Sequence, residues 1–308
     1  MDNYTTDTKD WLNDRFKATD EEGIYFAHQP IYGFRKGHSE PGIIIRYIIT
    51  YQIMKALSHI KFTSLIDVGG AEGYKAALAR SIFNVSVRSV DLSEEACNRA
   101  KEIFNIDGEP IDIHNLPYGD NEFDVVLCSE TLEHVVDIEK ATRELIRVCK
   151  KAVVITVPHE SKEVIENNIK RNIPHAHIHS LDTNSFDFTL SMTSKILSRR
   201  FHNPVMKLIA TLADSIKKER TNNIYKSILI STYNLFLPIL KYIFTDWAVE
   251  NLIELDDYIS NMLPSYSGII FVLLKDVNCY SSHPIQKISI PQIINFTVPW
   301  HYIREKST

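Results

Sequence analysis

Short β-branched runs alternate with segments of helical apolar spacing between Thr63 and Pro158. This alternation is typical of a parallel sheet flanked by helices. The run VVITV, near its end, is typical of a strand buried on both faces. We therefore expect an α/β core. The predicted strands are Ser64 to Val68, Val85 to Asp91, Glu109 to Ile113, Phe123 to Ser129 and Ala152 to Val157, and the predicted helices are Gly73 to Ile82, Ser93 to Phe104 and Ile138 to Val148.

Composition narrows the class of protein. Apolar residues make up 44% and charged residues 24% of the chain, as in ordinary soluble globular proteins. The formal net charge of -5 has the wrong sign for a protein that coats nucleic acid, so no nucleic-acid partner is expected. Residues 1–20 lack the pattern of a secretory signal, and no two cysteines form a Cys-x-x-Cys pair. We expect a cytoplasmic protein whose cysteines, Cys97, Cys128, Cys149 and Cys279, are reduced and buried.

The flanking segments predict attachments to this core. An apolar helical pattern runs from Gly42 to Leu57, after an aromatic-rich stretch, and we interpret both as a cap. Almost no strand character appears between Asp182 and Leu263, whereas SGIIFVLLK, which follows, predicts a strand that rejoins the sheet. The expected organisation is an N-terminal helical cap (1–62), a Rossmann-like core (63–182), a helical insertion or lid (183–264) and a closing strand with a tail (265–308).

A glycine-rich turn follows the first predicted strand, in SLIDVGGAEGYKAALA. Gly69, Gly70 and Gly73 permit positive φ and close backbone approach, and the next helix presents its first amides to a ligand. A dinucleotide fingerprint requires the spacing G-x-G-x-x-G, which from Gly69 meets Ala71 and Tyr74 instead. The string therefore predicts a nucleotide site but not the standard dinucleotide site.

This string resembles the first motif of class I S-adenosylmethionine-dependent methyltransferases, with Asp67, Gly69, Ala71 and Gly73 in the spaced positions and Ala71 in place of a common glycine. IDIHNLPYGDNEFDVVLCSETLEHV is similar to the third- and fourth-strand motifs of the same family, in its small-molecule, "methyltransferase type 11"-like branch. The resemblance runs from Leu65 to about His159. It implies a Rossmann-like sheet, the cofactor S-adenosyl-L-methionine and a transferase of class EC 2.1.1.-.

Candidate cofactor residues follow from strand ends and from the resemblance. Asp91 ends the second strand, where its carboxylate would accept the ribose hydroxyls or cap the next helix. The resemblance implies that Asp112 accepts the adenine amino group and that the Ile113 amide faces the ring. Ser129 and Glu130, at the end of the fourth strand, are expected beside the methionine part. The full predicted set is Asp67, Gly69, Gly70, Gly73, Asp91, Leu92, Asp112, Ile113, Ser129 and Glu130.

Histidines are the candidates for catalysis, because methyl transfer to a hydroxyl requires removal of a proton. His159 follows the fifth predicted strand, His179 lies in NIPHAHIHSLD, and His134 either faces the substrate or braces the fold. His175, His177 and His179 would share one face of an extended segment. With Glu160, Glu163 and Asp182 they could bind a divalent metal, but packing and substrate contact are the favoured interpretations and no metal is expected.

We expect O-methylation of a small molecule, a sugar or glycan, or a lipid-linked acceptor. A sugar hydroxyl is favoured because the His-rich segment resembles those of cell-surface polysaccharide methyltransferases. The alternatives are a methyltransferase-like module that binds the cofactor without turnover, and a nucleotide-dependent oxidoreductase.

One basic segment stands out in this acidic protein. Residues 195–220 contain seven Lys or Arg but only two acids, and Ser227 to Leu240 has no charged side chain. Fourteen residues are too few to span a bilayer, which takes about twenty. Two interpretations remain for residues 195–247. They form the buried centre of a lid or a homodimer interface, or they form an interfacial helix on an anionic membrane.

Overall fold

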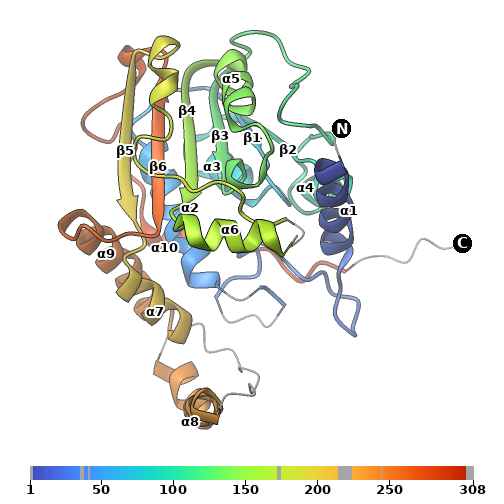
Figure 1. Ribbon diagram of the computed structural model, residues 1–308, viewed down its shortest axis with the longest axis vertical. Helices are drawn as coiled ribbons and strands as arrows, with labels where there is room; N and C mark the ends of the chain where they lie inside the picture. The colour runs from blue at the N-terminus through green and yellow to red at the C-terminus, as the bar shows by residue number, and fades with distance from the viewer. Residues whose placement is uncertain are drawn as a thin grey trace, which may run out of the picture.

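A mixed six-stranded sheet forms the centre of the protein (Figure 1). The computed structural model describes residues 3–34, 38–40, 42–171, 175–213, 224–243 and 245–302. The strands are β1 (Ser64–Val68), β2 (Ser86–Val90), β3 (Phe123–Ser129), β4 (Cys149–Pro158), β5 (Lys195–Phe201) and β6 (Gly268–Leu274), in the order β2-β1-β3-β4-β6-β5. The first four are parallel, and β6 is antiparallel to both β4 and β5. The Rossmann-like α/β class and the returning last strand are confirmed.

Helices cover both faces of the sheet because successive strand residues point to opposite sides. On one face, Leu65, Val125 and Val154 pack in a core shared with helices α2, α3 and α4. On the other face, Ile66 and Val126 pack against α5. The helices are α2 (Ile43–Leu57), α3 (Tyr74–Phe83), α4 (Glu94–Phe104) and α5 (Ile138–Val148), all predicted to within a residue or two of their ends. All four cysteines are free and buried, as expected.

The strand predicted from Glu109 to Ile113 is wrong. In this segment only Pro110 forms a bridge, a parallel one to Asp91. Proline has no N–H to donate to a ladder, and the chain turns at Ile113. The segment therefore lies beside the end of β2 as an irregular loop.

The prediction that residues 183–264 form a helical insertion with almost no strand character holds for α7, α8 and α9 but missed one strand. Strand β5 lies inside this insertion and pairs along its whole length with β6. Its sequence, KILSRRF, carries three basic residues that hide the apolar alternation. Charged side chains are common on edge strands because they discourage pairing with other chains. An edge position therefore explains why this strand was missed.

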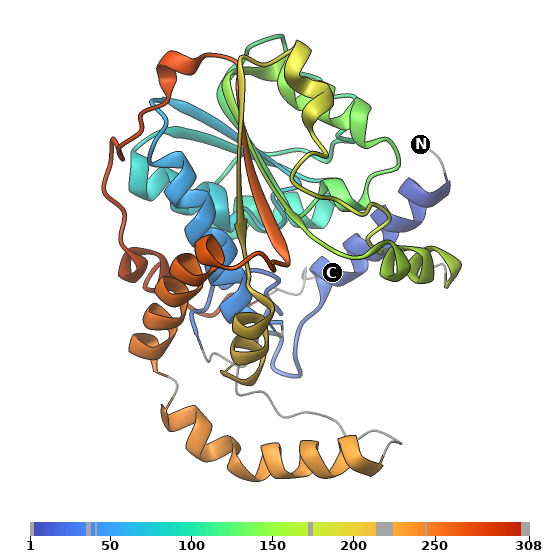
Figure 2. The same cartoon turned by 60° about the vertical axis from the view of Figure 1, so that its left-hand side comes forward.

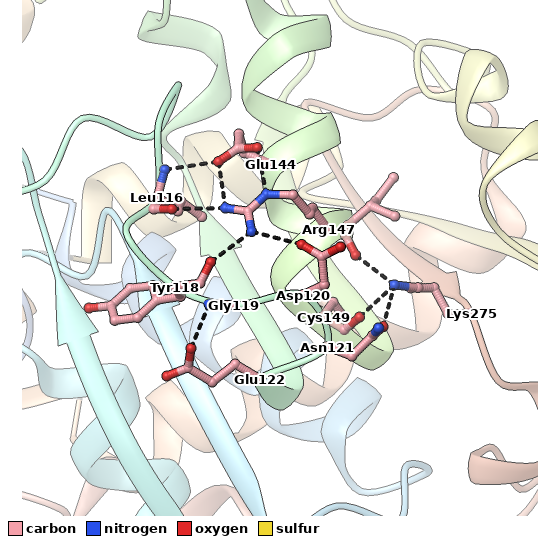
Figure 3. Close-up of polar contacts among 11 residues, drawn as sticks. Leu116, Tyr118, Gly119, Asp120, Asn121, Glu122, Glu144, Arg147, Cys149 and Lys275 are labelled. Carbon is pink, nitrogen blue, oxygen red and sulfur yellow. Dashed lines mark hydrogen bonds and ion pairs between the residues drawn. The ribbon is translucent and has the colours of Figure 1, made fainter.

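Arg147, on α5, fixes the loop that leads into β3 (Figure 3). Its guanidinium donates to the carbonyl oxygens of Leu116 and Tyr118 at 2.8 and 2.7 Å and to Asp120 Oδ1 at 3.0 Å. Glu144, one turn earlier on α5, accepts from the same guanidinium and from the Leu116 amide. These bonds hold the LPYGDN turn against α5 and so set the path of residues 112–116 toward the sheet edge.

The three helices of the insertion differ in how they pack on the rest of the protein. Helices α7 (Pro204–Ala213) and α9 (Asp246–Met262) pack on α2, and α9 also packs on β5. Helix α8 (Ile224–Ile243) has no buried residue, and Figure 2 shows it standing away from the sheet. Among the described helices none is long and apolar enough to cross a membrane alone, although α8 and α9, bent by 94°, pass that test as a pair. Sequence analysis offered a buried lid centre as one interpretation of residues 195–247, and the exposed helix α8 does not fit it.

Candidate functional site

The glycine-rich turn lies tightly against the end of β2. Gly69 and Gly70 both donate their amides to the Val90 carbonyl, at 2.8 and 3.0 Å, and Asp91 Oδ2 accepts from the Ala71 amide at 2.9 Å. A Cβ on Gly70 would lie 2.2 Å from Ser89 Oγ. Gly69 has φ +76 and Ala71 has φ +49, so both residues are in the left-handed region. Glycine adopts this conformation without strain, whereas the Cβ of Ala71 makes it unfavourable.

Gly73, which sequence analysis placed at the ligand, lies where two helices pack closely. Its φ is +77, and a Cβ there would lie 2.8 Å from the Cβ of Ala100 and 3.8 Å from Ile106. Both neighbours belong to α4 or its C-terminal end, and neither lines the pocket. Gly73 therefore lets α3 begin close to α4.

A pocket opens at the carboxyl ends of β1, β2 and β3, where open α/β sheets bind their ligands. Of the predicted cofactor residues, seven line it: Gly69, Asp91, Leu92, Asp112, Ile113, Ser129 and Glu130. Asp67, Gly70 and Gly73 are not among the lining residues. Asp91 Oδ1 accepts from the Ser93 amide at 3.0 Å, and the Ser93 hydroxyl caps α4 by accepting from the Ala96 amide. Because Asp91 Oδ2 also accepts from the Ala71 amide, Asp91 both supports the turn and lines the pocket.

The roof of the pocket comes from the N-terminal cap and not from the insertion. Helix α1 (Asn3–Lys17), which packs on α4, contributes Tyr4, Thr5, Thr8, Leu12 and Phe16, and α2 contributes Arg46 and Ile49. No residue of 183–264 is among the lining residues in the part of the chain that the structure describes. The expectation that the insertion covers the cofactor is therefore corrected.

A partly buried charge network, which the sequence did not reveal, lies under this roof. Glu40 accepts from Arg46 at 2.7 Å and from Arg15, and His28 Nδ1 lies 2.8 Å from the same carboxylate. Glu72 accepts from the Gln29 amide at 2.5 Å. Sequence analysis interpreted the aromatic-rich stretch 24–34 and the helical pattern from Gly42 to Leu57 as a cap, without predicting these contacts. The network fixes the cap over the pocket.

Lys75 and Asp67 are two buried groups of opposite charge beside the turn. Burial lowers the pKa of Lys75, and the nearby carboxylates Asp67 and Glu130 partly offset that effect. Burial raises the pKa of Asp67 to about 6, against the opposing influence of Lys75, and neither carboxyl oxygen of Asp67 has a hydrogen-bond partner. Lys75 lines the pocket, so the cation is the member of the pair that a ligand would meet.

The predicted histidines occupy different places. His134 lines the pocket, stacks on His175 with ring centroids 3.7 Å apart, and places Nδ1 3.1 Å from the Ala176 carbonyl. His179 Nε2 lies 2.6 Å from the Val135 carbonyl, and His159 Nδ1 lies 2.6 Å from the Leu181 carbonyl. Neither His159 nor His179 lines the pocket. Of the three candidates for catalysis, the structure brings His134 to the site.

Two glutamates complete this side of the site. Glu130, directly after β3, has φ +54, and its Oε1 is buried without a hydrogen-bond partner. Glu133 is 1% exposed, and both of its carboxyl oxygens lack hydrogen-bond partners. Burial raises the pKa of both groups, and the charge of Glu130 adds to the shift of Glu133. Sequence analysis placed Glu130 at the ligand edge but passed over Glu133.

Comparison with known proteins agrees with this geometry. Residues 66–157 match the family described as "Methyltransferase domain". This segment is a class I methyltransferase domain. The match begins in β1 and ends in β4, so it contains the glycine-rich turn, Asp91, Asp112 and Glu130. The resemblance predicted from the motifs is confirmed.

Individual relatives match only part of this chain. Norajmaline N-methyltransferase of Rauvolfia serpentina is 33% identical over 101 residues, which are 30% of this chain and 35% of that protein. Glycine/sarcosine/dimethylglycine N-methyltransferase of Actinopolyspora halophila is 29% identical over 133 residues, which are 40% of this chain and 24% of that protein. The chain thus spans about a third or less of these relatives.

Among solved structures, geranyl diphosphate C-methyltransferase from Streptomyces coelicolor, crystallised with Mg²⁺, geranyl diphosphate and S-adenosyl-L-homocysteine, has a TM-score of 0.53 at 15% identity. The match covers 89% of this chain and 98% of that one. At this identity the likeness shows a shared fold that extends beyond the domain match. It does not transfer the substrate.

Proposed function

We propose that this protein is an S-adenosyl-L-methionine-dependent methyltransferase that acts on a hydroxyl of a small molecule, a sugar or glycan, or a lipid-linked acceptor. The observation that carries the proposal is the pocket at the carboxyl ends of β1 to β3, lined by Asp91, Asp112 and Glu130 within the matched domain. The relatives act on nitrogen and carbon acceptors, so the choice of oxygen rests on the histidines and glutamates of the site alone.

The pocket residues fit the cofactor chemically. Glu130 Oε1, buried and without a partner, suits a cationic ligand group such as the amine of a methionine moiety. Asp91 and Asp112 supply carboxylates for hydroxyl and amino donors, and the adjacent Leu92 and Ile113 supply apolar surface for a ring. When bound, the cofactor supplies a methyl group on a sulfonium. The chain's residues bind and orient it and, through the roof of α1, exclude water.

Calorimetry with S-adenosylhomocysteine, S-adenosylmethionine and NAD tests the cofactor. We expect binding of the first two and none of NAD, whereas preference for NAD would favour the oxidoreductase alternative. Transfer of labelled methyl into the glycan, lipid and small-metabolite fractions of a source-cell extract tests turnover. Cofactor binding without transfer into any fraction would favour a binding module.

We also propose that α8 brings the enzyme to an anionic membrane surface on the cytoplasmic side, where a lipid-linked acceptor would be presented. The helix exposes Leu229 at 69%, Leu235 at 75% and Tyr242 at 85%, and its only charges are Lys226 and Lys241. A helix with apolar residues and basic ends suits the boundary between headgroups and acyl chains. Part of the basic segment, including Lys217, Lys218 and Arg220, lies outside the described residues. A homodimer interface is the competing explanation of the same exposed surface.

A further inference from the structure

Three side chains outside the predicted set of cofactor residues gather at and beside the pocket. Glu133, His134 and His177 each offer one ligand atom, and these three atoms lie within 4.8 Å of one another. Glu133 lies on the short helix Leu132–His134 after β3, and His177 comes from the segment that follows α6 (Lys162–Lys170). A tetrahedral ion about 2.1 Å from each ligand would hold the atoms about 3.4 Å apart, so closure requires the longest separation to shorten by up to about 1.4 Å.

The buried carboxylate of Glu133 indicates that this cluster needs a ligand. Both of its oxygens are buried and lack a hydrogen-bond partner, although a buried carboxylate normally accepts bonds or pairs with a cation. The nearest positively chargeable group is His134, whose Nε2 lies 3.7 Å from Glu133 Oε1, beyond hydrogen-bond distance. A cation between these groups would satisfy the carboxylate.

Both histidines are oriented as metal ligands commonly are, with one ring nitrogen held by an acceptor and the other left to the metal. His134 Nδ1 lies 3.1 Å from the Ala176 carbonyl, which can only accept, so Nδ1 carries the hydrogen and Nε2 the lone pair. His177 Nδ1 lies 2.9 Å from Glu160 Oε2, which fixes the second ring in the same way. The backbone supports the arrangement, because the Ile178 amide donates to the Glu133 carbonyl at 2.8 Å.

We propose that Glu133, His134 and His177 bind a divalent cation of the Mn²⁺, Co²⁺ or Zn²⁺ type, with Glu160 as the group that orients His177. Two imidazoles and one carboxylate suit these ions, and three protein ligands leave positions open for a hydroxyl or water. The sequence expectation had placed a metal, if any, among His175, His177, His179 and exposed carboxylates. In the structure only His177 of that set joins the cluster. His175 stacks on His134, and His179 bonds to the Val135 carbonyl.

The site has a role in the proposed reaction, on which this part of the inference rests. His134 and the neighbouring Glu130 line the pocket, so an open position on the ion can face an acceptor there. A divalent ion lowers the pKa of a bound water or hydroxyl by several units. The ion would therefore allow the acceptor oxygen to lose its proton near neutral pH, which an isolated alcohol cannot do, and would favour hydroxyl acceptors over amines.

Metal binding can be measured without any acceptor. Titration of the metal-free protein with Mn²⁺, followed by the electron paramagnetic resonance signal of the free ion, should show one site per chain, and Co²⁺ should give a visible absorption band. Glu133→Gln and His177→Ala should each weaken binding at least tenfold, and Glu160→Gln about 10- to 100-fold. The matched control is His179→Ala, which removes a histidine two residues from His177 and should leave the affinity unchanged.

Several outcomes would overturn the site. These are the absence of stoichiometric Mn²⁺ or Co²⁺ binding, binding that survives both Glu133→Gln and His177→Ala, or equal loss in His179→Ala. Because Glu133 is buried and its variant can fail to fold, the partly exposed His177 provides an independent variant. S-adenosylhomocysteine binding by the metal-free protein separates this result from failure of the proposed function. If S-adenosylhomocysteine binds and the metal does not, only the proposed metal site is wrong.

Discussion

Asp91 Oδ2 lies 2.9 Å from the backbone nitrogen of Ala71, so the carboxylate at the end of β2 holds the glycine-rich turn that follows β1. The same side chain lines the pocket, and its other oxygen accepts from the Ser93 amide. Sequence analysis offered two roles for Asp91, ligand binding or capping of the next helix. The structure assigns the cap to Ser93, and Asp91 connects the turn to the ligand edge.

Asp91→Ala should weaken S-adenosylhomocysteine binding by about 2 to 3 kcal/mol, roughly 30- to 150-fold, because charged hydrogen bonds contribute about this much. The variant loses the carboxylate that faces the pocket and the bond that holds Ala71. Calorimetry compares it with Asp107→Ala, a control that removes an exposed carboxylate paired only with Lys101 on the surface. Equal affinities in all three proteins would show that the nucleotide site is elsewhere.

Ala71→Gly should stabilise the protein by up to about 1 kcal/mol. Ala71 has φ +49, a conformation that costs an L-residue about 1 to 2 kcal/mol, partly offset by the greater freedom of glycine in the unfolded chain. Chemical denaturation measures the change. Ala71→Val, with a β-branched side chain at the same φ, should lower the free energy of unfolding, and stabilisation by valine would contradict the assignment of strain.

Gly73→Ala should destabilise the protein by about 2 kcal/mol or more while the folded variant still binds S-adenosylhomocysteine normally. The added Cβ meets Ala100 at 2.8 Å, and overpacking of this kind costs about 1 to 3 kcal/mol in addition to the strain of φ +77. The double variant with Ala100→Gly removes the clash and should recover the packing part of the loss. Loss of binding without loss of stability would restore the ligand role that the motif suggested.

Asp67→Asn should change how stability depends on pH. The pKa of Asp67 is raised to about 6 in the folded protein from 3.8, so the folded state holds its proton more tightly than the unfolded state. Stability therefore falls as pH rises from about 4 through 6, by up to about 3 kcal/mol for a shift of this size.

The asparagine variant lacks this dependence, so its stability relative to the wild type should increase between pH 4 and pH 8. Urea denaturation at several pH values measures the difference, and Asp276→Asn, at the cap of the short helix Val277–Cys279, is the control. Parallel pH profiles for the wild type and Asp67→Asn would show that the buried carboxyl does not titrate in this range.

Local sequence patterns predicted the features that depend on residues close together in the chain, namely buried strands and helix caps. The apolar runs of β3, β4 and β6 indicated strands because they are buried on both faces, and Ser93 indicated a cap because its hydroxyl reaches the Ala96 amide three residues on. Strand β5 was missed because an edge strand pairs on one side only and tolerates the basic residues of KILSRRF. The motif also could not distinguish Gly69, at the pocket, from Gly73, which packs on Ala100.

The remaining parts of the site depend on contacts between distant segments. Helix α1 covers the pocket because it docks on α4, and the polar sequence NYTTDTKDWLNDRFK has no pattern that predicts this partner. The meeting of Glu133 with His177 is likewise set by the path of the chain after α6, where the Ile178 amide bonds to the Glu133 carbonyl. The sequence shows which residues are present, but it does not show which distant residues they contact in the folded chain.

The exposure of α8 predicts binding to anionic vesicles. Flotation with neutral phosphatidylcholine and with mixtures containing phosphatidylglycerol should show binding that increases with anionic lipid and decreases with salt, because Lys226 and Lys241 provide the charge. Leu229→Asp and Phe236→Asp should abolish it. The control Leu190→Asp changes an apolar residue of similar exposure outside α8 and should have no effect. If nothing floats and sedimentation shows a dimer that Phe236→Asp dissociates, the exposed helix is instead an interface between two copies of the chain.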